Sequence, residues 1–191
     1  MRLSVPRIEP IQDADLTEEQ RLAVAPAMVN RPLLNIYRTL AHAPEALTAF
    51  LRWGGYVFSR QNSLAPRQRE LVILRVGFLC RSGYEFTQHT AHGLRAGLTD
   101  AEIQAVKAGA LDPAWDPADT SLIRAADELV SDHFVSDRTW ETLGRHFSRK
   151  QCMDLVFTVG QYVLVSMSLN TFGVQLDTGQ ALDDDLKSAG G

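Results

Sequence analysis

The signals that start and stop α-helices recur along the whole chain, and they constrain its fold more than any other feature. Three segments place a Thr or Ser three residues before a Gln or Glu, the spacing of a capping box: Thr17 to Gln20, Thr99 to Glu102 and Ser148 to Gln151. Gly97 and Gly109 follow apolar segments at points where a helix would end. No run of alternating apolar and polar residues competes with these helices. The sequence therefore predicts an all-α protein.

Apolar residues at helical spacing between these signals predict about eight helices. Pro44 separates two of them, because proline disfavours a helical conformation in the residue before it. Pro66 suits the first turn of another helix, where its missing N–H costs nothing. The only sizeable internal loop is expected at 111–118, which contains two prolines and two aspartates. A helix is expected from about residue 17, followed by helices at about 32–41, 44–59, 66–81, 84–96, 99–109, 119–133, 136–147 and 148–170.

The size and composition of the chain predict a single domain. Its 191 residues, of which 45% are hydrophobic, are sufficient for one buried core. We expect an N-terminal extension over 1–31 that packs on the core, a helical domain over 32–178 and a flexible tail over 179–191. Several helices are apolar over more than one face, which predicts a homo-oligomer, whether dimer, trimer or hexamer. Small residues of the last helix, Gly160, Ser166 and Ser168, would permit close helix approach.

The charge pattern and the apolar segments exclude several kinds of partner. The formal net charge is −4 and no basic block is present, so we expect no nucleic-acid partner. The first residues lack the apolar core of a signal peptide, which predicts a cytoplasmic protein. The longest apolar stretch, 155–169, contains polar residues and is shorter than the ~18 residues of a membrane span. We therefore expect a buried helix there and no membrane partner.

Three ionisable residues mark a candidate site. Glu85, His89 and His92 stand at positions i, i+4 and i+7, so in a helix their side chains share one face. Glu70 lies in the preceding helix, and the short connection lets the two helices pack antiparallel with this carboxyl group alongside. Two nearby carboxylates in a site closed to water disfavour each other's ionisation, which raises one pKa. The spacing therefore indicates a general acid beside an imidazole.

These residues also have a purely structural interpretation. Glu85 and His89 can form an ordinary helix-stabilising pair, while the second histidine can simply face solvent. Glu70 can pair with Arg67 in its own helix or be answered by Arg75. Spacing alone leaves these alternatives open.

The cysteines and two amides of the last helix are the other candidates. Cys80 and Cys152 match neither a disulfide framework nor a zinc spacing, so we expect both to be reduced and partly buried. An isolated cysteine on an apolar face, such as Cys80, is interpreted as a packing residue rather than a nucleophile. Gln161 and Asn170 can reach a subunit boundary or a pocket, or can be satisfied inside the protein.

A family resemblance lies in residues 67–103, RQRELVILRVGFLCRSGYEFTQHTAHGLRAGLTDAEI. This segment is similar to the core of the carboxymuconolactone decarboxylase and alkylhydroperoxidase-D family. Three further segments resemble a branch of the same family whose members have longer chains and no cofactor: Asn35-Ile-Tyr-Arg-Thr-Leu, Val159-Gly-Gln-Tyr and Ser168-Leu-Asn170. In the peroxidase branch a Glu precedes the motif C-x-x-C-x-x-x-H, and the two thiols form a redox pair. Glu70 and His89 match this pattern, but Ser82 and Glu85 stand at the cysteine positions. Peroxide reduction through a disulfide therefore has no chemical basis here.

The resemblance implies an alkylhydroperoxidase-D-like helical fold and, through Glu85-Phe-Thr-Gln-His89, the chemistry of the decarboxylase branch. It implies a cofactor-free acid–base enzyme, without a metal, that acts on a small organic acid or lactone by decarboxylation or proton transfer. In this hypothesis His89 transfers the proton. Glu85 orients the His89 ring or donates the proton itself, and Glu70 adjusts the acidity of both groups. The candidate substrate-binding residues are Tyr84, His92 and Ser82.

Other functions stay open at this stage. The same groups could move a proton between two carbons, which would make the protein an isomerase or a hydrolase. A thiol-type hydroperoxide reductase would depend on Cys80. A metal-dependent enzyme could use Glu85, His89, His92 and Glu70 as ligands, since imidazole and carboxylate suit several divalent ions. The last alternative is a non-catalytic oligomer that binds a small molecule.

Overall fold

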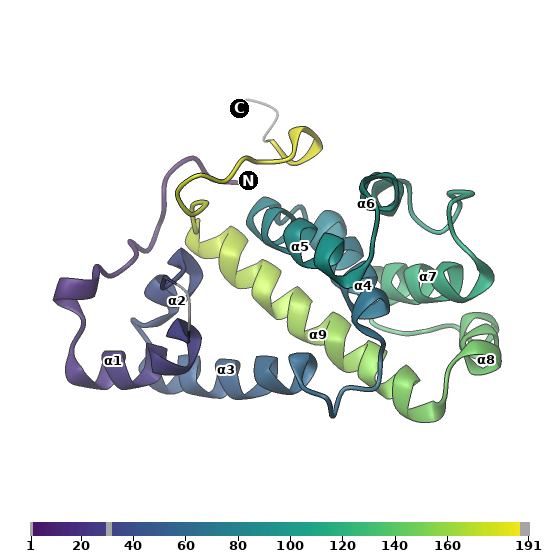
Figure 1. Cartoon of the computed structure of the whole chain (residues 1–191), viewed down its shortest axis with the longest axis horizontal. Helices are drawn as coiled ribbons and strands as arrows, with labels where there is room; N and C mark the ends of the chain where they lie inside the picture. The colour runs from purple at the N-terminus through teal and green to yellow at the C-terminus, as the bar shows by residue number, and fades with distance from the viewer. Residues whose placement is uncertain (1, 30–31, 188–191) are drawn as a thin grey trace.

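The computed structural model describes residues 2–29 and 32–187 (Figure 1). Within these residues the chain forms nine α-helices and three short 3₁₀-helices, and no β-strand. The all-α class is confirmed, and the nine α-helices in the described part of the chain match the helix expected from about residue 17 and the eight expected after it. The helices are α1 (Glu18–Val24), α2 (Asn35–Leu40), α3 (Pro44–Phe58), α4 (Pro66–Leu79), α5 (Gly83–Ala96), α6 (Asp100–Ala108), α7 (Pro117–Ser131), α8 (Asp137–His146) and α9 (Arg149–Phe172).

The capping signals found in the sequence are formed in the structure. Thr17, Thr99 and Ser148 each accept a hydrogen bond from the backbone N–H three residues on, and the side chain there accepts one in return. Gly97 ends α5 with a φ of 101°, a left-handed conformation that a residue with a Cβ rarely adopts. α7 begins at Pro117 rather than near residue 119, because the Asp116 side chain caps it.

α4 is the central helix of the core and packs against α5, α7 and α9. Figure 1 shows α9 running through the middle of the molecule, with α1 to α3 on one side and α4 to α8 on the other. Because these three helices and α6 surround α4, its apolar residues from Leu71 to Leu74 are completely buried. The packing of α4 on α5 places Glu70 at the interface of these two helices.

α9 has 24 residues, bounded by the capping box of Ser148 and by Gly173 at its C-terminus. Of the helices in the described ranges, it alone is long and apolar enough to cross a membrane by length and composition, and 56% of its apolar window is buried inside the protein. Leu155, Val159 and Tyr162 belong to the largest apolar cluster. α9 is therefore a core helix, as the sequence predicts for 155–169, and it extends beyond that stretch at both ends.

The described segments before α1 and after α9 pack on the helical core. The backbone N–H of Arg7 donates a hydrogen bond of 2.8 Å to the carbonyl oxygen of Phe172. Lys107 donates to the carboxylates of Asp183 and Asp185, and Leu186 is buried in the apolar cluster around α6. The structure thus differs from the flexible tail expected over 179–191, because these contacts hold the segment as far as residue 187. Residues 188–191 of that prediction lie outside the described residues.

Candidate active site

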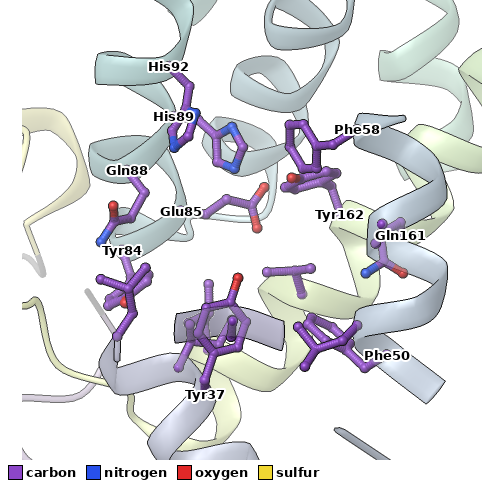
Figure 2. A pocket seen from close by; sticks show the side chains of 18 of the residues that line it. Tyr37, Phe50, Phe58, Tyr84, Glu85, Gln88, His89, His92, Gln161 and Tyr162 are labelled. Atoms are coloured by element: carbon purple, nitrogen blue, oxygen red, sulfur yellow. The ribbon is translucent and has the colours of Figure 1, made fainter. Parts of the chain in front are cut away.

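A cavity of 440 Å³ lies between α2, α3, α5 and α9 (Figure 2). α5 forms one wall and presents Glu85, Gln88, His89 and His92 to the space. The other walls are largely aliphatic or aromatic and include Ile36, Phe50, Phe58, Tyr162, Val165 and Leu169. A volume of this size, with a few polar groups among apolar ones, is typical of a small-molecule site.

Glu70 and His89 meet at the wall of this cavity. The Nδ1 atom of His89 lies 2.7 Å from Oε2 of Glu70, and both residues are at least nine-tenths buried. A carboxylate can only accept, so Nδ1 carries the hydrogen of this bond. The other ring nitrogen, Nε2, is then the one that can exchange a proton with a molecule in the cavity. The structure therefore brings together the acid of α4 and the imidazole of α5.

Aromatic rings hold the His89 imidazole in place. The ring of Tyr162 meets it edge-on with 4.9 Å between centroids, and the ring of His92 lies 5.2 Å away. Phe58 stacks on it at 6.1 Å. Packing on several sides restricts the rotation of the imidazole, so the hydrogen bond to Glu70 keeps one geometry.

Glu85 is buried and accepts a hydrogen bond of 3.0 Å from the hydroxyl of Ser166 on α9. Its other oxygen, Oε1, has no hydrogen-bond partner among the described residues. Gly77 on α4 leaves room for this oxygen, because a Cβ there would lie only 3.3 Å from it. Burial raises the pKa of Glu85 well above its ordinary value, and the Ser166 hydrogen bond lowers it in part. The carboxyl group is therefore biased to its neutral, protonated form.

Two details of the Glu85 hypothesis are changed by this geometry. The raised pKa was expected from the charge of Glu70, but its cause is the loss of water around Glu85. His89 donates its hydrogen bond to Glu70 and not to Glu85, which instead accepts one from Ser166. Glu70 does not pair with Arg67, which binds Asp119 and Glu102. The alternative pairing with Arg75 is not formed either, since that guanidinium bonds to the Asp127 carboxylate and to backbone carbonyls of α6.

Tyr84 lines the cavity, but its hydroxyl is engaged elsewhere. It donates a hydrogen bond of 2.5 Å to Oδ2 of Asp177, and burial raises its pKa above the ordinary value. Gln88 donates to the same carboxylate oxygen at 2.9 Å. Asp177 thus ties the segment that follows α9 to the wall of the cavity. A bound molecule can contact the Tyr84 ring, whereas its hydroxyl already has an acceptor.

The structure places the other two candidate binding residues differently from one another. His92 lines the cavity, as its position on the face of α5 predicts. Ser82 is fully buried, does not line the cavity, and its hydroxyl has no partner among the described residues. Its proposed contact with a substrate is therefore not possible in this conformation, because Ser82 precedes α5 on the side that packs into the core.

α9 supplies further site residues: the sequence leaves a place in a pocket open for Gln161, but it assigns no site role to Tyr162 or Ser166. Gln161 is buried and lines the cavity, and its Oε1 has no partner among the described residues. Tyr162 contacts His89, and Ser166 contacts Glu85. The helical spacing of these three residues was a signal that they share one side of α9. Asn170, in contrast, donates to the backbone oxygen of Cys80 and does not line the cavity.

Neither thiols nor a cluster of metal-ligating side chains is found at this site. Cys80 and Cys152 are free, and burial raises the pKa of both thiols. Across the two ranges that the structure describes, no three His, Cys, Asp or Glu residues come together in a way that could hold a metal ion. The polar groups that meet at the cavity are thus carboxyl, imidazole and amide groups.

These observations define a class of protein: an all-α domain in which a Glu and a His of two packed helices meet at the wall of an apolar cavity. Residues 44–128 match the model of the carboxymuconolactone decarboxylase family. This segment, which is less than half of the chain, includes Glu70, Glu85 and His89, and its match agrees with the family resemblance that the sequence predicts.

Known proteins share this fold at low sequence identity. A peroxidase-related protein from Ralstonia eutropha JMP134, described as an alkylhydroperoxidase AhpD core, has a TM-score of 0.80 and 18% identity, with 92% of this chain and 94% of that one covered. The debrominase Bmp8 in complex with 2,3,4-tribromopyrrole has a TM-score of 0.70 and 12% identity, with 90% and 91% covered. The uncharacterized protein YdfG of Bacillus subtilis (strain 168) is 22% identical over 121 residues, which are 62% of this chain and 81% of that protein. The alkylhydroperoxidase-D-like fold is therefore confirmed.

Proposed function

We propose that the protein is a cofactor-free acid–base enzyme that acts on a small organic acid or lactone, by decarboxylation or by proton transfer. The observation that carries this proposal is the 2.7 Å hydrogen bond between Glu70 and His89 at the wall of a cavity that also contains Glu85. A cytoplasmic location is part of the same proposal.

His89 is the proton-transfer residue in this proposal. Its Nδ1–H donates to Glu70, so Nε2 can accept a proton from a carbon acid in the cavity. The imidazolium that forms would lie beside the Glu70 carboxylate, which stabilises the positive charge. Glu70 thus orients the ring and compensates its charge, as a partner of His89 rather than as a second acid.

Glu85 assists the proposed reaction as a general acid. Its neutral form, favoured by burial, can donate a hydrogen bond or a proton to an oxygen on which negative charge develops. Loss of carbon dioxide from a substrate leaves such a charge, and protonation at carbon then completes the reaction. The proton required can come from Glu85 or from the protonated ring of His89.

The residues at the family's cysteine positions favour this chemistry over thiol chemistry. Ser82 and Glu85 stand there, and Cys80 and Cys152 are free cysteines with raised pKa values. A thiolate, not a thiol, is the nucleophile in peroxide reduction. The name of the Ralstonia eutropha relative, peroxidase-related, therefore does not suggest the reaction of this chain.

The proposal is tested by proton exchange. The protein is incubated in D₂O with a panel of small lactones and unsaturated carboxylic acids, while NMR records deuterium incorporation and a gas sensor records carbon dioxide. We expect wild-type protein to turn over at least one compound, and His89→Gln to lower the rate by roughly 10²–10⁴-fold.

The matched control is His146→Gln, which changes an exposed histidine on α8 and should leave the rate unchanged. Circular dichroism of each variant checks that the fold is retained. Full activity of His89→Gln would refute the role of the Glu70–His89 pair. Binding of panel compounds without any exchange or decarboxylation would favour a non-catalytic binding protein.

A further inference from the structure

The only basic side chains among the described residues that line the cavity are His89, which bonds to Glu70, and His92. Among the described residues that line it there is no lysine and no arginine, although the chain contains 19 such residues. Arg69 lies close by, with its guanidinium carbon 5.0 Å from the centre of the Phe58 ring, but it does not line the cavity. Arg67 and Arg75 bind acidic side chains instead.

An ionised substrate would be costly in such a space. Burying a carboxylate without a cation or several hydrogen-bond donors is strongly unfavourable. Here the charge of Glu70, which lies behind His89 and does not line the cavity, would add repulsion to the cost of desolvation. The raised pKa of Glu85 fits the same environment, because a site that disfavours one negative charge disfavours another.

Polar and apolar groups occupy different walls. Glu85, Gln88 and His89 follow one another along one side of α5, whereas α2, α3 and α9 supply mainly aliphatic and aromatic side chains, with the amide of Gln161 as a polar exception on α9. Figure 2 shows Glu85 reaching into the space from the α5 wall, with Phe50 and Tyr37 opposite, while Gln88 turns toward Tyr84. A molecule that fits has one polar edge and a larger apolar body.

We infer that the substrate is an uncharged ring compound with a carbonyl edge, a lactone or cyclic ketone rather than a free carboxylate. Its carbonyl edge faces α5, and its ring lies against the aromatic side chains of α3 and α9. This inference rests on the proposed function and narrows it, because of the two proposed substrate classes, organic acids and lactones, it selects the uncharged lactones.

Three probes with one carbon skeleton test the charge and the ring separately. Dihydrocoumarin is a neutral lactone, 3-(2-hydroxyphenyl)propanamide is its neutral ring-opened amide, and 3-(2-hydroxyphenyl)propanoate is the corresponding carboxylate. Binding to wild-type protein is measured at pH 7.5 by ligand-observed NMR. We expect the lactone and the amide to bind at least about tenfold more tightly than the carboxylate.

Leu51→Trp shows whether the probes occupy this cavity, because Leu51 lines it and the larger side chain fills it. Lactone binding should be lost in this variant and kept in Leu111→Trp, which changes an exposed loop residue. Equal or tighter binding of the carboxylate than of the lactone overturns the inference. Loss of this carboxylate binding in Arg69→Gln would then identify Arg69 as the cation that binds it. Failure of the lactone to bind also overturns it. Because no turnover is needed, this result is independent of the effect of His89→Gln on catalysis.

A second, independent feature is an exposed apolar stripe on α9. Met153, Val156, Phe157, Leu164 and Met167 are 49%, 37%, 36%, 45% and 54% exposed. Together with Gly160 they are the exposed residues of α9 between positions 153 and 167, and none is polar. Trp53 of α3 adjoins the stripe, with its ring edge-on to Phe157. A contiguous apolar surface of this kind is typical of an interaction site.

The stripe has similar residues on both sides of Gly160. Met153 lies seven residues before it and Met167 seven after, while Val156 lies four before and Leu164 four after. A two-fold axis through Gly160 would pair Met153 with Met167 of the partner subunit, which is the self-complementarity that an isologous contact requires. A Cβ at Gly160 would meet nothing within 4 Å, so a second helix can approach closely there.

The positive charge of Arg149 at the start of α9 fits the same arrangement. Arg149 lies eleven residues before Gly160 and Thr171 eleven after it. In an antiparallel pair Arg149 would lie near the C-terminal turn of the partner's α9, where the helix dipole favours a cation. The structure thus assigns this stripe to a second copy of the chain, in an antiparallel α9–α9 dimer.

Sedimentation velocity at micromolar concentration tests the dimer. We expect a dimer for wild-type protein and a monomer for Leu164→Lys, while Leu111→Lys in an exposed loop leaves the dimer intact. Gly160→Cys should form a disulfide between two copies on oxidation, because the axis brings the two positions together. A monomeric wild type, a dimeric Leu164→Lys or a dimer that Gly160→Cys does not cross-link would each contradict this assignment.

Discussion

Oε2 of Glu70 and Nδ1 of His89 lie 2.7 Å apart, in a hydrogen bond that joins α4 to α5 inside the protein. Because both side chains are buried, neither can replace this partner with water at no cost. The bond therefore decides which ring nitrogen of His89 carries hydrogen. It also leaves the opposite nitrogen for the cavity that His89 lines.

The first prediction concerns the tautomer of His89. We expect ¹⁵N NMR of the imidazole to show the Nδ1–H form in the neutral ring of wild-type protein, because Glu70 accepts from that atom. Glu70→Leu removes the acceptor, and the preference for this tautomer should be lost. His146, an exposed histidine, serves as the internal reference in the same spectrum. An Nε2–H ring in wild-type protein would contradict the proton transfer that we assign to Nε2.

The second prediction is a pH dependence of stability that originates at Glu85. The pKa of Glu85 is raised in the folded protein by burial, so the folded state holds its proton at pH values where the unfolded chain has lost it. Stability therefore falls as the pH rises from the ordinary carboxyl pKa of 4.5 toward the raised value. We expect Glu85→Gln, which keeps the shape without the charge, to flatten this part of the curve.

Urea unfolding of both proteins between pH 5 and pH 8 measures this effect. The control is Glu141→Gln, which changes an exposed glutamate on α8 and should follow the wild-type curve. Ser166→Ala should extend the fall to higher pH, since the hydrogen bond from Ser166 lowers the pKa of Glu85. Parallel curves for wild type and Glu85→Gln would show that Glu85 does not titrate in this range.

The helical fold could be predicted because its signals are local. The capping boxes at Thr17, Thr99 and Ser148 form as their spacing predicts, and the boundary at Gly97 follows from a single φ of 101°. The early start of α7 was missed because the Asp at its N-cap was read as part of a loop rich in proline. The packing of the C-terminal segment could not be predicted, since it depends on Lys107 in a distant helix.

The site could be predicted only within α5 and its neighbour. Positions i and i+4 place Glu85 and His89 on one face, and a short connection brings Glu70 alongside. Which of the two acids bonds to the imidazole depends on side-chain geometry that spacing does not contain. The contact of Ser166 with Glu85 joins residues 81 positions apart, so no local pattern reports it.

The third prediction concerns acid stability at Asp154. This carboxylate accepts hydrogen bonds from Tyr56, from the backbone N–H and hydroxyl of Ser63, and from Lys150. Burial alone would raise its pKa, but these donors outweigh burial and lower the pKa from 3.8 to about 2. A lowered folded-state pKa contributes stability above the ordinary value, and this contribution is lost as the pH falls through about 2.

We therefore expect Asp154→Asn to destabilise the protein near pH 6 by roughly 1–3 kcal/mol, because buried donors lose a charged acceptor. The difference from wild type should shrink as the pH falls from 3.8 toward about 2, where the wild-type carboxylate is itself protonated. Thermal unfolding at a series of pH values measures it. A difference that persists unchanged in acid would mean that the loss comes from packing and not from charge.

The fourth prediction connects the C-terminal segment to the cavity. Lys107 binds Asp183 and Asp185 in the segment that follows α9. Earlier in the same segment, Asp177 accepts hydrogen bonds from Tyr84 and Gln88 at the cavity wall. Lys107→Met keeps the apolar stem but removes both ion pairs. We expect faster amide hydrogen exchange over residues 179–187 in this variant, measured by mass spectrometry.

Lys187→Met is the matched control, because Lys187 pairs only with Asp184 in its own turn among the described contacts. Exchange over 179–187 should stay close to wild type there. If Lys107→Met accelerates exchange in 179–187 and in α5 around Gln88, the segment supports the cavity wall through Asp177. Acceleration confined to 179–187 would show that the hydrogen bonds of Asp177 hold without the ion pairs. No acceleration at all would mean that burial of Leu186 is sufficient to keep residues 179–187 in place.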